Sequence, residues 1–325
     1  MAESLLEVVG LSVDYLTDAG DVRAVDRVSL TVESGEFLGI VGESGCGKST
    51  LLFGVSHLLS PPGEVVEGKV VFRGRDMVRL GRDELRHVRW RDFSLVMQSA
   101  MNALNPMKSI GAQFSDTLRA HERLSAEAVR KRSAEVLGLV GIDPVHLNSY
   151  PHQLSGGMRQ RAMIAMALLF TPQIVLMDEP TSALDVVAQQ SLMRKIKDLQ
   201  QTLGFAVIFV THDMSVVSRY SDRMLVMYAG QIAEAARTEA IFSQPLHPYT
   251  RGLINAFPSV TGPRRELSGI PGAPPDLARP PGGCRFHPRC PEMMPECTTR
   301  EPEVYPVAGA EVRCLLYAES AERGG

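Results

Sequence analysis

The sequence has no hydrophobic run long enough to cross a membrane. Its longest apolar stretch, residues 162–170, has nine residues, whereas a spanning helix needs about 18 or more. The first residues, Met1-Ala2-Glu3-Ser4, lack the basic region and the cleavable apolar core of an export signal. We therefore expect a cytoplasmic protein, in which any role at a membrane comes through a partner.

An excess of charge of one sign is also missing. The chain of 325 residues has 34 lysines and arginines against 37 aspartates and glutamates, which gives a net charge of −3. We therefore expect no nucleic-acid partner drawn by bulk attraction. With 44% hydrophobic and 22% charged residues, the composition is that of a globular protein, and the length suggests two domains.

Cysteine is scarce, and its distribution is uneven. Cys46 stands alone, while Cys284, Cys290, Cys297 and Cys314 fall within 31 residues in a proline-rich part of the chain. In a reducing compartment such a group indicates metal binding before disulfides. Four thiolates suit Zn²⁺ or an iron–sulfur cluster, although the C-x₂₋₄-C pairs usual for zinc are absent. Buried or disulfide-bonded thiols are the remaining alternative. Residues 258–306 have little periodic apolar pattern, so this segment needs such a staple.

The most informative stretch is Phe37–Thr50, in which an apolar run ends in glycines and a helical pattern follows. It fits G-x-x-x-x-G-K-[ST], a loop whose glycines let backbone N–H groups surround a phosphate at the positive end of a helix. Lys48 is expected to reach the β- and γ-phosphates, and the Ser49 hydroxyl to bind Mg²⁺. The predicted nucleotide-binding residues of this loop are Gly42, Ser44, Gly45, Cys46, Gly47, Lys48, Ser49 and Thr50.

Two carboxylates directly follow a predicted buried strand, Ile174–Met177. Asp178, at the carboxyl end of a parallel strand, suits Mg²⁺. Glu179 is placed to orient or deprotonate a water molecule. A surface acidic pair is the alternative, but the apolar strand and the upstream phosphate loop argue against it.

Three further positions are candidates for ligand binding. Ser155 is expected to cap a helix that runs to Phe170, and Gly156 and Gly157 leave N–H groups bare at its first turn. His212 follows the predicted strand 206–210, at the end of a parallel strand where ligand crevices form. Tyr15, before the loop, either stacks on an adenine or is an ordinary strand tyrosine.

The remaining pattern predicts an alternation of strands and helices. We expect strands at 6–15, 24–32, 68–73, 93–97 and 224–227, and helices at 49–59, within 107–150 and at 188–203. The arginines of 79–91 and the run 130–132 are predicted to lie on solvated helix faces.

These motifs, together with Gln98 and Ser182–Asp185, occur in an order that resembles the ATPase cassette of ABC transporters. The resemblance covers residues 1 to about 235. It implies an α/β fold with a RecA-like P-loop core, an antiparallel β subdomain and a helical subdomain at about 107–165. A small Cys- and Pro-rich domain would then occupy 236–325.

The resemblance also implies roles at matching positions. Tyr15 is similar to the aromatic that stacks on adenine, and Gln98 to the residue that contacts Mg²⁺ and water and links the site to the permease. Glu179 resembles the catalytic carboxylate and His212 the switch histidine. Asp185 is similar to the aspartate at the dimer interface, and Ser155, Gly156 and Gly157 resemble the signature that closes over ATP bound to the opposite subunit.

The C-terminal part resembles that of oligopeptide and dipeptide importers. The matching stretches are 244–250, Gln-Pro-Leu-His-Pro-Tyr-Thr, and 283–290, Gly-Cys-Arg-Phe-His-Pro-Arg-Cys. Members of that family hold a [4Fe-4S] cluster at such cysteines. The resemblance implies two transmembrane permeases, a second ABC ATPase (a paralogue rather than a second copy), an extracytoplasmic substrate-binding protein, and a place on the cytoplasmic face of the membrane.

Two alternatives stay open at this point. Many peptide importers have an acidic residue after the glutamine, whereas Ser99 follows Gln98 here. The same cassette could therefore serve uptake of oligosaccharides, nickel or opines. A soluble ABC ATPase of repair, translation or iron–sulfur assembly is the other class. It is disfavoured because the chain has one cassette and no long coiled coil.

Overall fold

The structure is a computed structural model that describes residues 4–18, 20–97, 103–182, 184–256 and 269–318. Its contacts divide the chain into two compact units, each built from several segments. The first contains residues 1–5, 32–37 and 79–209, and the second contains 6–31, 38–78 and 210–325. The domain boundary near residue 235 stays a prediction.

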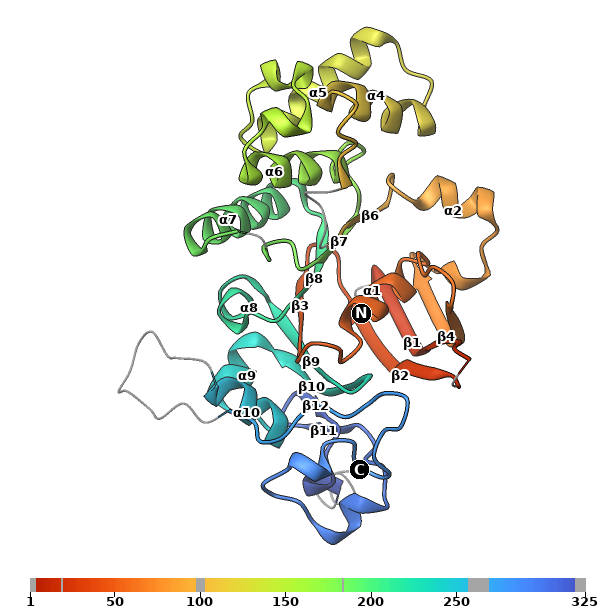
Figure 1. The fold of residues 1–325 in the computed structure, drawn as a ribbon, viewed down its shortest axis with the longest axis vertical. Helices are drawn as coiled ribbons and strands as arrows, with labels where there is room; N and C mark the ends of the chain where they lie inside the picture. The colour runs from red at the N-terminus through yellow and green to blue at the C-terminus, as the bar shows by residue number, and fades with distance from the viewer. Residues whose placement is uncertain (1–3, 19, 98–102, 183, 257–268, 319–325) are drawn as a thin grey trace. The chain divides into compact units, whose positions relative to one another are not determined.

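The first unit combines helices with parallel strands (Figure 1). Its elements are α2 (Arg82–Val88), β6 (Phe93–Val96), α4 (Ile110–His121), α5 (Ala126–Leu139), α6 (Gly156–Ala167), β7 (Ile174–Asp178), α7 (Val186–Leu203) and most of β8 (Ala206–Thr211). Strand β7 lies between β6 and β8 and is parallel to β6. It is buried along its whole length, which explains its continuous apolar run.

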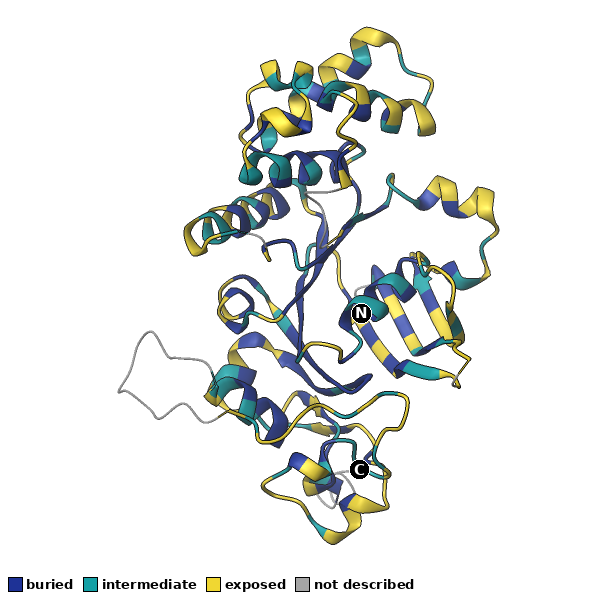
Figure 2. Cartoon of the chain, in the orientation of Figure 1, coloured by how far each residue is buried: buried dark blue, intermediate teal, exposed yellow. Residues whose placement is uncertain are grey.

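The helices of the first unit have the burial that their sequences predict. In α7 the buried positions include Leu192, Ile196 and Leu199, one face of a helix. Helix α2 is mostly exposed, which confirms a solvated face for the arginine-rich segment (Figure 2). Helices α4 and α5, capped by Ser109 and Ser125, confirm the helical interpretation of 107–150. Helix α6 ends at Ala167, before the predicted Phe170, because Leu168 leaves the helical conformation as its C-cap.

The second unit contains the phosphate-loop sequence and two groups of strands. Its elements are β1 (Leu6–Tyr15), β2 (Val22–Val32), β3 (Phe37–Val41), α1 (Lys48–Val55), β4 (Gly63–Phe72), β5 (Arg75–Asp76), α8 (Met214–Tyr220), β9 (Arg223–Tyr228), β10 (Gln231–Arg237), α9 (Thr238–Ser243), α10 (Pro248–Asn255), β11 (Tyr305–Val307) and β12 (Ala310–Val312). The order β2-β1-β4-β5 forms one sheet, in which β4 is antiparallel to β1 and β5. This confirms the strands predicted at 6–15 and 24–32.

The other strands of the second unit follow the order β11-β12-β10-β9-β3. Strand β9 is parallel to β3 and antiparallel to β10. The short hairpin β11–β12 extends this sheet, because β12 pairs with β10 at Glu234 and Ala235. Residues near the C-terminus thereby become part of the sheet that contains the strand before the phosphate loop.

His247 begins α10 from a fully buried position. It is 3% exposed, and its Nδ1 accepts a hydrogen bond from the Tyr249 N–H at 3.0 Å. Burial lowers the pKa of His247 to about 3, whereas an unfolded histidine titrates near 6.5. The folded chain therefore holds this histidine neutral throughout the range in which the unfolded chain takes up a proton.

Acid is accordingly expected to destabilise the chain through His247. Stability is lost as the pH falls below the unfolded pKa, and between pH 7 and 5 this group alone accounts for about 2 kcal/mol. We expect the urea midpoint to fall less steeply over this interval in His247→Asn, whose side-chain oxygen replaces Nδ1 as the capping acceptor. His152→Gln, at an exposed histidine, is the control and should keep the wild-type slope. Equal slopes in all three proteins would contradict the prediction.

Candidate functional site

The phosphate loop connects the buried strand β3 to helix α1 in the second unit. Lys48 lies inside the loop, where its Nζ donates to the carbonyl oxygens of Gly42 and Glu43, each at 2.9 Å. The Cys46 thiol lies 3.7 Å from the same Nζ, and its burial raises the pKa of the thiol. The Gly230 N–H donates to the Cys46 carbonyl at 2.9 Å, so the turn between β9 and β10 supports the loop.

Glycine is required at position 47 for two reasons. Gly47 has a φ of +101°, in the region that side chains disfavour. A Cβ there would collide with the carbonyl oxygen of Ala24 on β2. The pattern of the loop is therefore explained by close backbone contacts within the second unit.

Tyr15 is the last residue of β1 and lies beside α1. Its hydroxyl shares a hydrogen bond of 3.1 Å with Thr50 Oγ1, on the first turn of the helix that follows the loop. The ring is half-buried. This places the aromatic within the unit that holds the phosphate loop, and stacking on an adenine stays a prediction.

The two predicted carboxylates lie at the end of β7, in the first unit. Asp178 is 3% exposed, and Glu179 follows it with a φ of +44°, uncommon for a residue other than glycine. Such a conformation turns the chain sharply out of the strand. The two neighbouring carboxylates therefore have different environments, one buried at the strand end and one half-buried in the turn.

The Ser155 segment also belongs to the first unit. The Ser155 hydroxyl caps α6 by accepting from the Met158 N–H at 3.3 Å, and Ser155 is exposed. Gly156 and Gly157 form the first turn, and a Cβ on Gly157 would meet no neighbour within 4 Å. The helix therefore presents an uncovered N-terminus, as the sequence predicted.

The other predicted residues lie at the starts of α7 and α8. The Asp185 carboxylate caps α7 by accepting from the Ala188 N–H at 2.8 Å, which gives it a structural task besides the predicted one. His212 is exposed directly after β8. Gln98 lies outside the described residues. The second unit thus holds the phosphate loop, Tyr15 and His212, and the first holds Ser155, Asp178, Glu179 and Asp185.

Sequence reasoning missed three residues that contact the phosphate loop or the turn that supports it. Tyr249 and Arg289 contact Glu43, while Arg285 contacts Ala229 and Asp26. Their only signal was that 244–250 and 283–290 resemble peptide importers. Nothing in the sequence connects these segments to the loop.

The four C-terminal cysteines are close neighbours. The Cys284 N–H donates to the Cys297 carbonyl at 2.9 Å, and none of the cysteines forms a disulfide. Burial raises the pKa of the Cys314 thiol to about 12, and the other three cysteines act on it in the same direction. Across the part of the chain that the structure describes, no three His, Cys, Asp or Glu side chains are arranged to hold a metal ion.

A phosphate loop after a parallel strand, a buried aspartate at a strand end and a helix opened by Ser-Gly-Gly define an ATP-binding cassette. The family model "ABC transporter" matches residues 25–182, and the model "Oligopeptide/dipeptide transporter, C-terminal region" matches residues 233–297. A dimeric structure of the ATP-binding cassette MJ0796 with ADP and Pi aligns with a TM-score of 0.64 at 30% identity, covering 72% of this chain and 98% of that one.

Curated relatives match almost end to end. The dipeptide transport ATP-binding protein DppD of Bacillus subtilis (strain 168) is 45% identical, covering 98% of this chain and 97% of the relative. DppD of Caldanaerobacter subterraneus subsp. tengcongensis is 42% identical over 97% and 98%. The oligopeptide transport ATP-binding protein OppD of B. subtilis is 42% identical over 94% and 86%. The chain belongs to the family of ATP-binding subunits of dipeptide and oligopeptide ABC transporters.

Among the described residues, no helix is long and apolar enough to cross a membrane.

Proposed function

We propose that the chain is the ATP-hydrolysing subunit of a binding-protein-dependent importer of dipeptides or oligopeptides. The observation that carries the proposal is a complete set of cassette motifs in a chain that also matches the C-terminal region of peptide transporters. The subunit would act at the cytoplasmic face of the membrane, with two permeases and a second ATPase. A substrate-binding protein on the other side would deliver the peptide.

The proposed chemistry is phosphoryl transfer to water, in which the protein mainly positions groups and neutralises charge. The glycines of the loop and Lys48 would hold the β- and γ-phosphates. Ser49, Asp178 and Gln98 would hold Mg²⁺, which neutralises charge on the phosphate oxygens when it is bound. Glu179 would orient the attacking water molecule.

Two further residues, His212 and Ser155, would contact the phosphates of ATP. His212 would contact the γ-phosphate. Ser155, at the uncovered end of α6, would close over ATP bound to the opposite cassette, and the helix dipole would favour that anion by about 0.3–2 kcal/mol. The exposure of both side chains supports this assignment.

We further propose that the four C-terminal cysteines hold a [4Fe-4S] cluster. Four free thiols that influence one another in one short segment support it, as does the donor chemistry, because thiolates are the ligands of such clusters. Zn²⁺ is the competing occupant. The cluster would hold together a segment that contributes to a small apolar cluster of Tyr305, Val312, Cys314 and Ala318.

Tagged protein purified anoxically from native membranes tests both proposals. Two multi-spanning permeases and a second ATPase should co-purify, and a peptide should stimulate ATP hydrolysis by the complex with its binding protein. Recovery without any permease would contradict the importer.

Metal analysis of the same preparation tests the cluster. We expect roughly four iron and four sulfide ions per chain, and their loss in Cys290→Ser. Cys46→Ser should keep them, because Cys46 lies in the phosphate loop. Stoichiometric zinc without sulfide would replace the cluster by a zinc site.

A further inference from the structure

The segment Gly283–Cys290 contacts the phosphate loop through Arg289. This arginine makes a two-pronged ion pair with the Glu43 carboxylate, with Nη1–Oε2 at 2.7 Å and Nη2–Oε1 at 2.9 Å. The Arg289 side chain is 5% exposed and that of Glu43 is 24% exposed. The Arg289 Nε donates to the Pro271 carbonyl at 2.7 Å, and this hydrogen bond fixes the plane of the guanidinium group. Such a paired geometry is the strongest form of arginine–carboxylate contact.

The backbone of the same loop residue is held by Tyr249 of α10. The Tyr249 hydroxyl accepts a hydrogen bond from the Glu43 N–H at 3.0 Å, and Tyr249 is fully buried. Its ring packs against Tyr228 and Phe286, with centroids 4.5 and 5.4 Å away. In the sequence, Phe286 lies between Arg285 and Arg289. Both the main chain and the side chain of Glu43 are therefore fixed from the C-terminal region.

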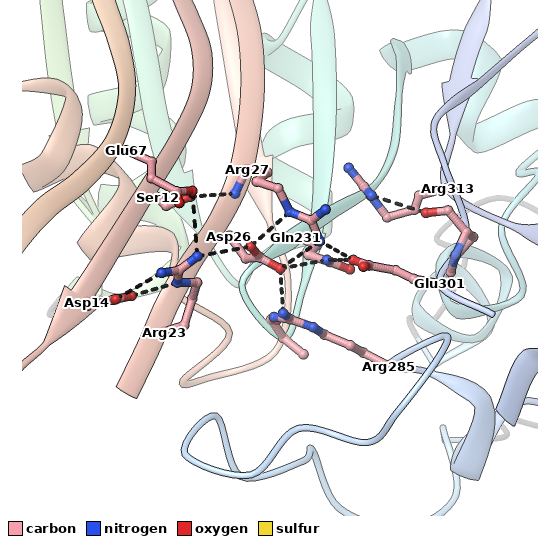
Figure 3. A network of polar contacts seen from close by, with 12 residues as sticks. Ser12, Asp14, Arg23, Asp26, Arg27, Glu67, Gln231, Arg285, Glu301 and Arg313 are labelled. Carbon is pink, nitrogen blue, oxygen red and sulfur yellow. Dashed lines mark hydrogen bonds and ion pairs between the residues drawn. The ribbon is translucent and has the colours of Figure 1, made fainter. Parts of the chain in front are cut away.

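A second arginine of the segment holds the support of the loop. Arg285 donates to the Ala229 carbonyl and to the Asp26 carboxylate, which also accepts from Gln231 at 2.9 Å (Figure 3). Ala229 precedes Gly230, whose N–H donates to the loop carbonyl of Cys46. Arg289 thus contacts the loop directly, and Arg285, four residues before it, contacts the turn that supports the loop.

The negative charge of Glu43 is unfavourable in a phosphate-binding loop, and Arg289 compensates it. Glu43 is the only carboxylate within the loop 42–50, which is proposed to bind the most highly charged part of ATP. A carboxylate there repels the phosphates unless its charge is compensated, and little water is available to screen a pair whose arginine is buried. The ion pair supplies that compensation.

We propose that Arg289 is a positioning residue for ATP binding, which neutralises Glu43 and holds the phosphate loop in its binding conformation. This rests on the proposed function of that loop. Arg289 lies directly before Cys290, so the same ion pair joins the cysteine segment to the phosphate loop. The C-terminal region is accordingly a part of the ATP site as well as a family-specific extension.

The test measures ATP hydrolysis by the purified transporter complex. Arg289→Gln should raise the KM for ATP roughly tenfold, because an uncompensated carboxylate then faces the phosphates, while kcat changes little. Adding Glu43→Gln should return the KM to within about threefold of wild type, since it removes that charge. Arg289→Lys, which keeps the charge but loses the paired geometry, should be intermediate.

The matched control is Arg300→Gln, which removes an exposed ion pair with Glu296 in the same C-terminal region and should leave the KM unchanged. An unchanged KM in Arg289→Gln would overturn the proposal. So would a raised KM that Glu43→Gln does not rescue, because Arg289 would then act only through folding. Should Arg289→Gln fail to fold, Arg289→Lys with and without Glu43→Gln decides by the same comparison. Lys48→Ala tests the proposed function of the loop separately from the role of Arg289. Undiminished ATP hydrolysis in Lys48→Ala would contradict the proposal that this loop binds ATP.

Discussion

Glu179→Gln is expected to lower kcat for ATP hydrolysis by about 10²- to 10⁴-fold, the usual contribution of a positioned general base. The amide is nearly isosteric but cannot accept a proton from water. Because Glu179 lies beyond the end of β7 and outside the phosphate loop, affinity for ATP should stay close to wild type. Single-turnover hydrolysis and equilibrium binding of ATP, measured on the same preparation, separate the two quantities.

The neighbouring carboxylate provides the contrast for this experiment. Asp178 is buried at the end of the same strand and is proposed as a Mg²⁺ ligand. Asp178→Asn should therefore raise the Mg²⁺ concentration needed for half-maximal activity, whereas Glu179→Gln should not. Unaltered turnover in Glu179→Gln would exclude this residue as the base.

Sequence pattern predicted the elements that carry the proposed chemistry, because each has a strong local cause. The strand before Asp178 is a run of apolar residues typical of a fully buried parallel strand, and the structure confirms it as Ile174–Asp178. Ser155 caps the helix that follows it, as its position before that helix predicted. Where capping, apolar period and glycine spacing agree, local sequence is sufficient.

Contacts between segments that are distant in the sequence could not be predicted from local sequence patterns. Glu43 and Arg289 are 246 residues apart, and neither position has a pattern that names its partner. The strands β11 and β12 have three residues each, too short to show an alternating period. The proline-rich C-terminal segment was therefore expected to need a staple, and its pairing with β10 was not predicted.

Two glycines of the site should respond very differently to a single added methyl group. In Gly47→Ala the new Cβ would overlap the Ala24 carbonyl, at a backbone φ of +101°. Relieving this strain, of the order of 1–3 kcal/mol, moves the N–H groups away from their phosphate-binding arrangement. We expect ATP affinity to fall by up to about 100-fold, measured by equilibrium binding to the purified chain.

Gly157→Ala is the matched variant, because the added Cβ meets open space at the first turn of α6. ATP binding to the isolated chain should be unchanged, since this helix end is proposed to act on nucleotide held by the opposite cassette. Hydrolysis by the assembled complex should fall, because the added methyl group would stand at the helix turn that is proposed to face that nucleotide. If Gly157→Ala weakened ATP binding to the isolated chain as strongly as Gly47→Ala does, both segments would bind the same nucleotide within one chain. That result would contradict the proposal that the N-terminus of α6 acts on ATP bound to the opposite cassette.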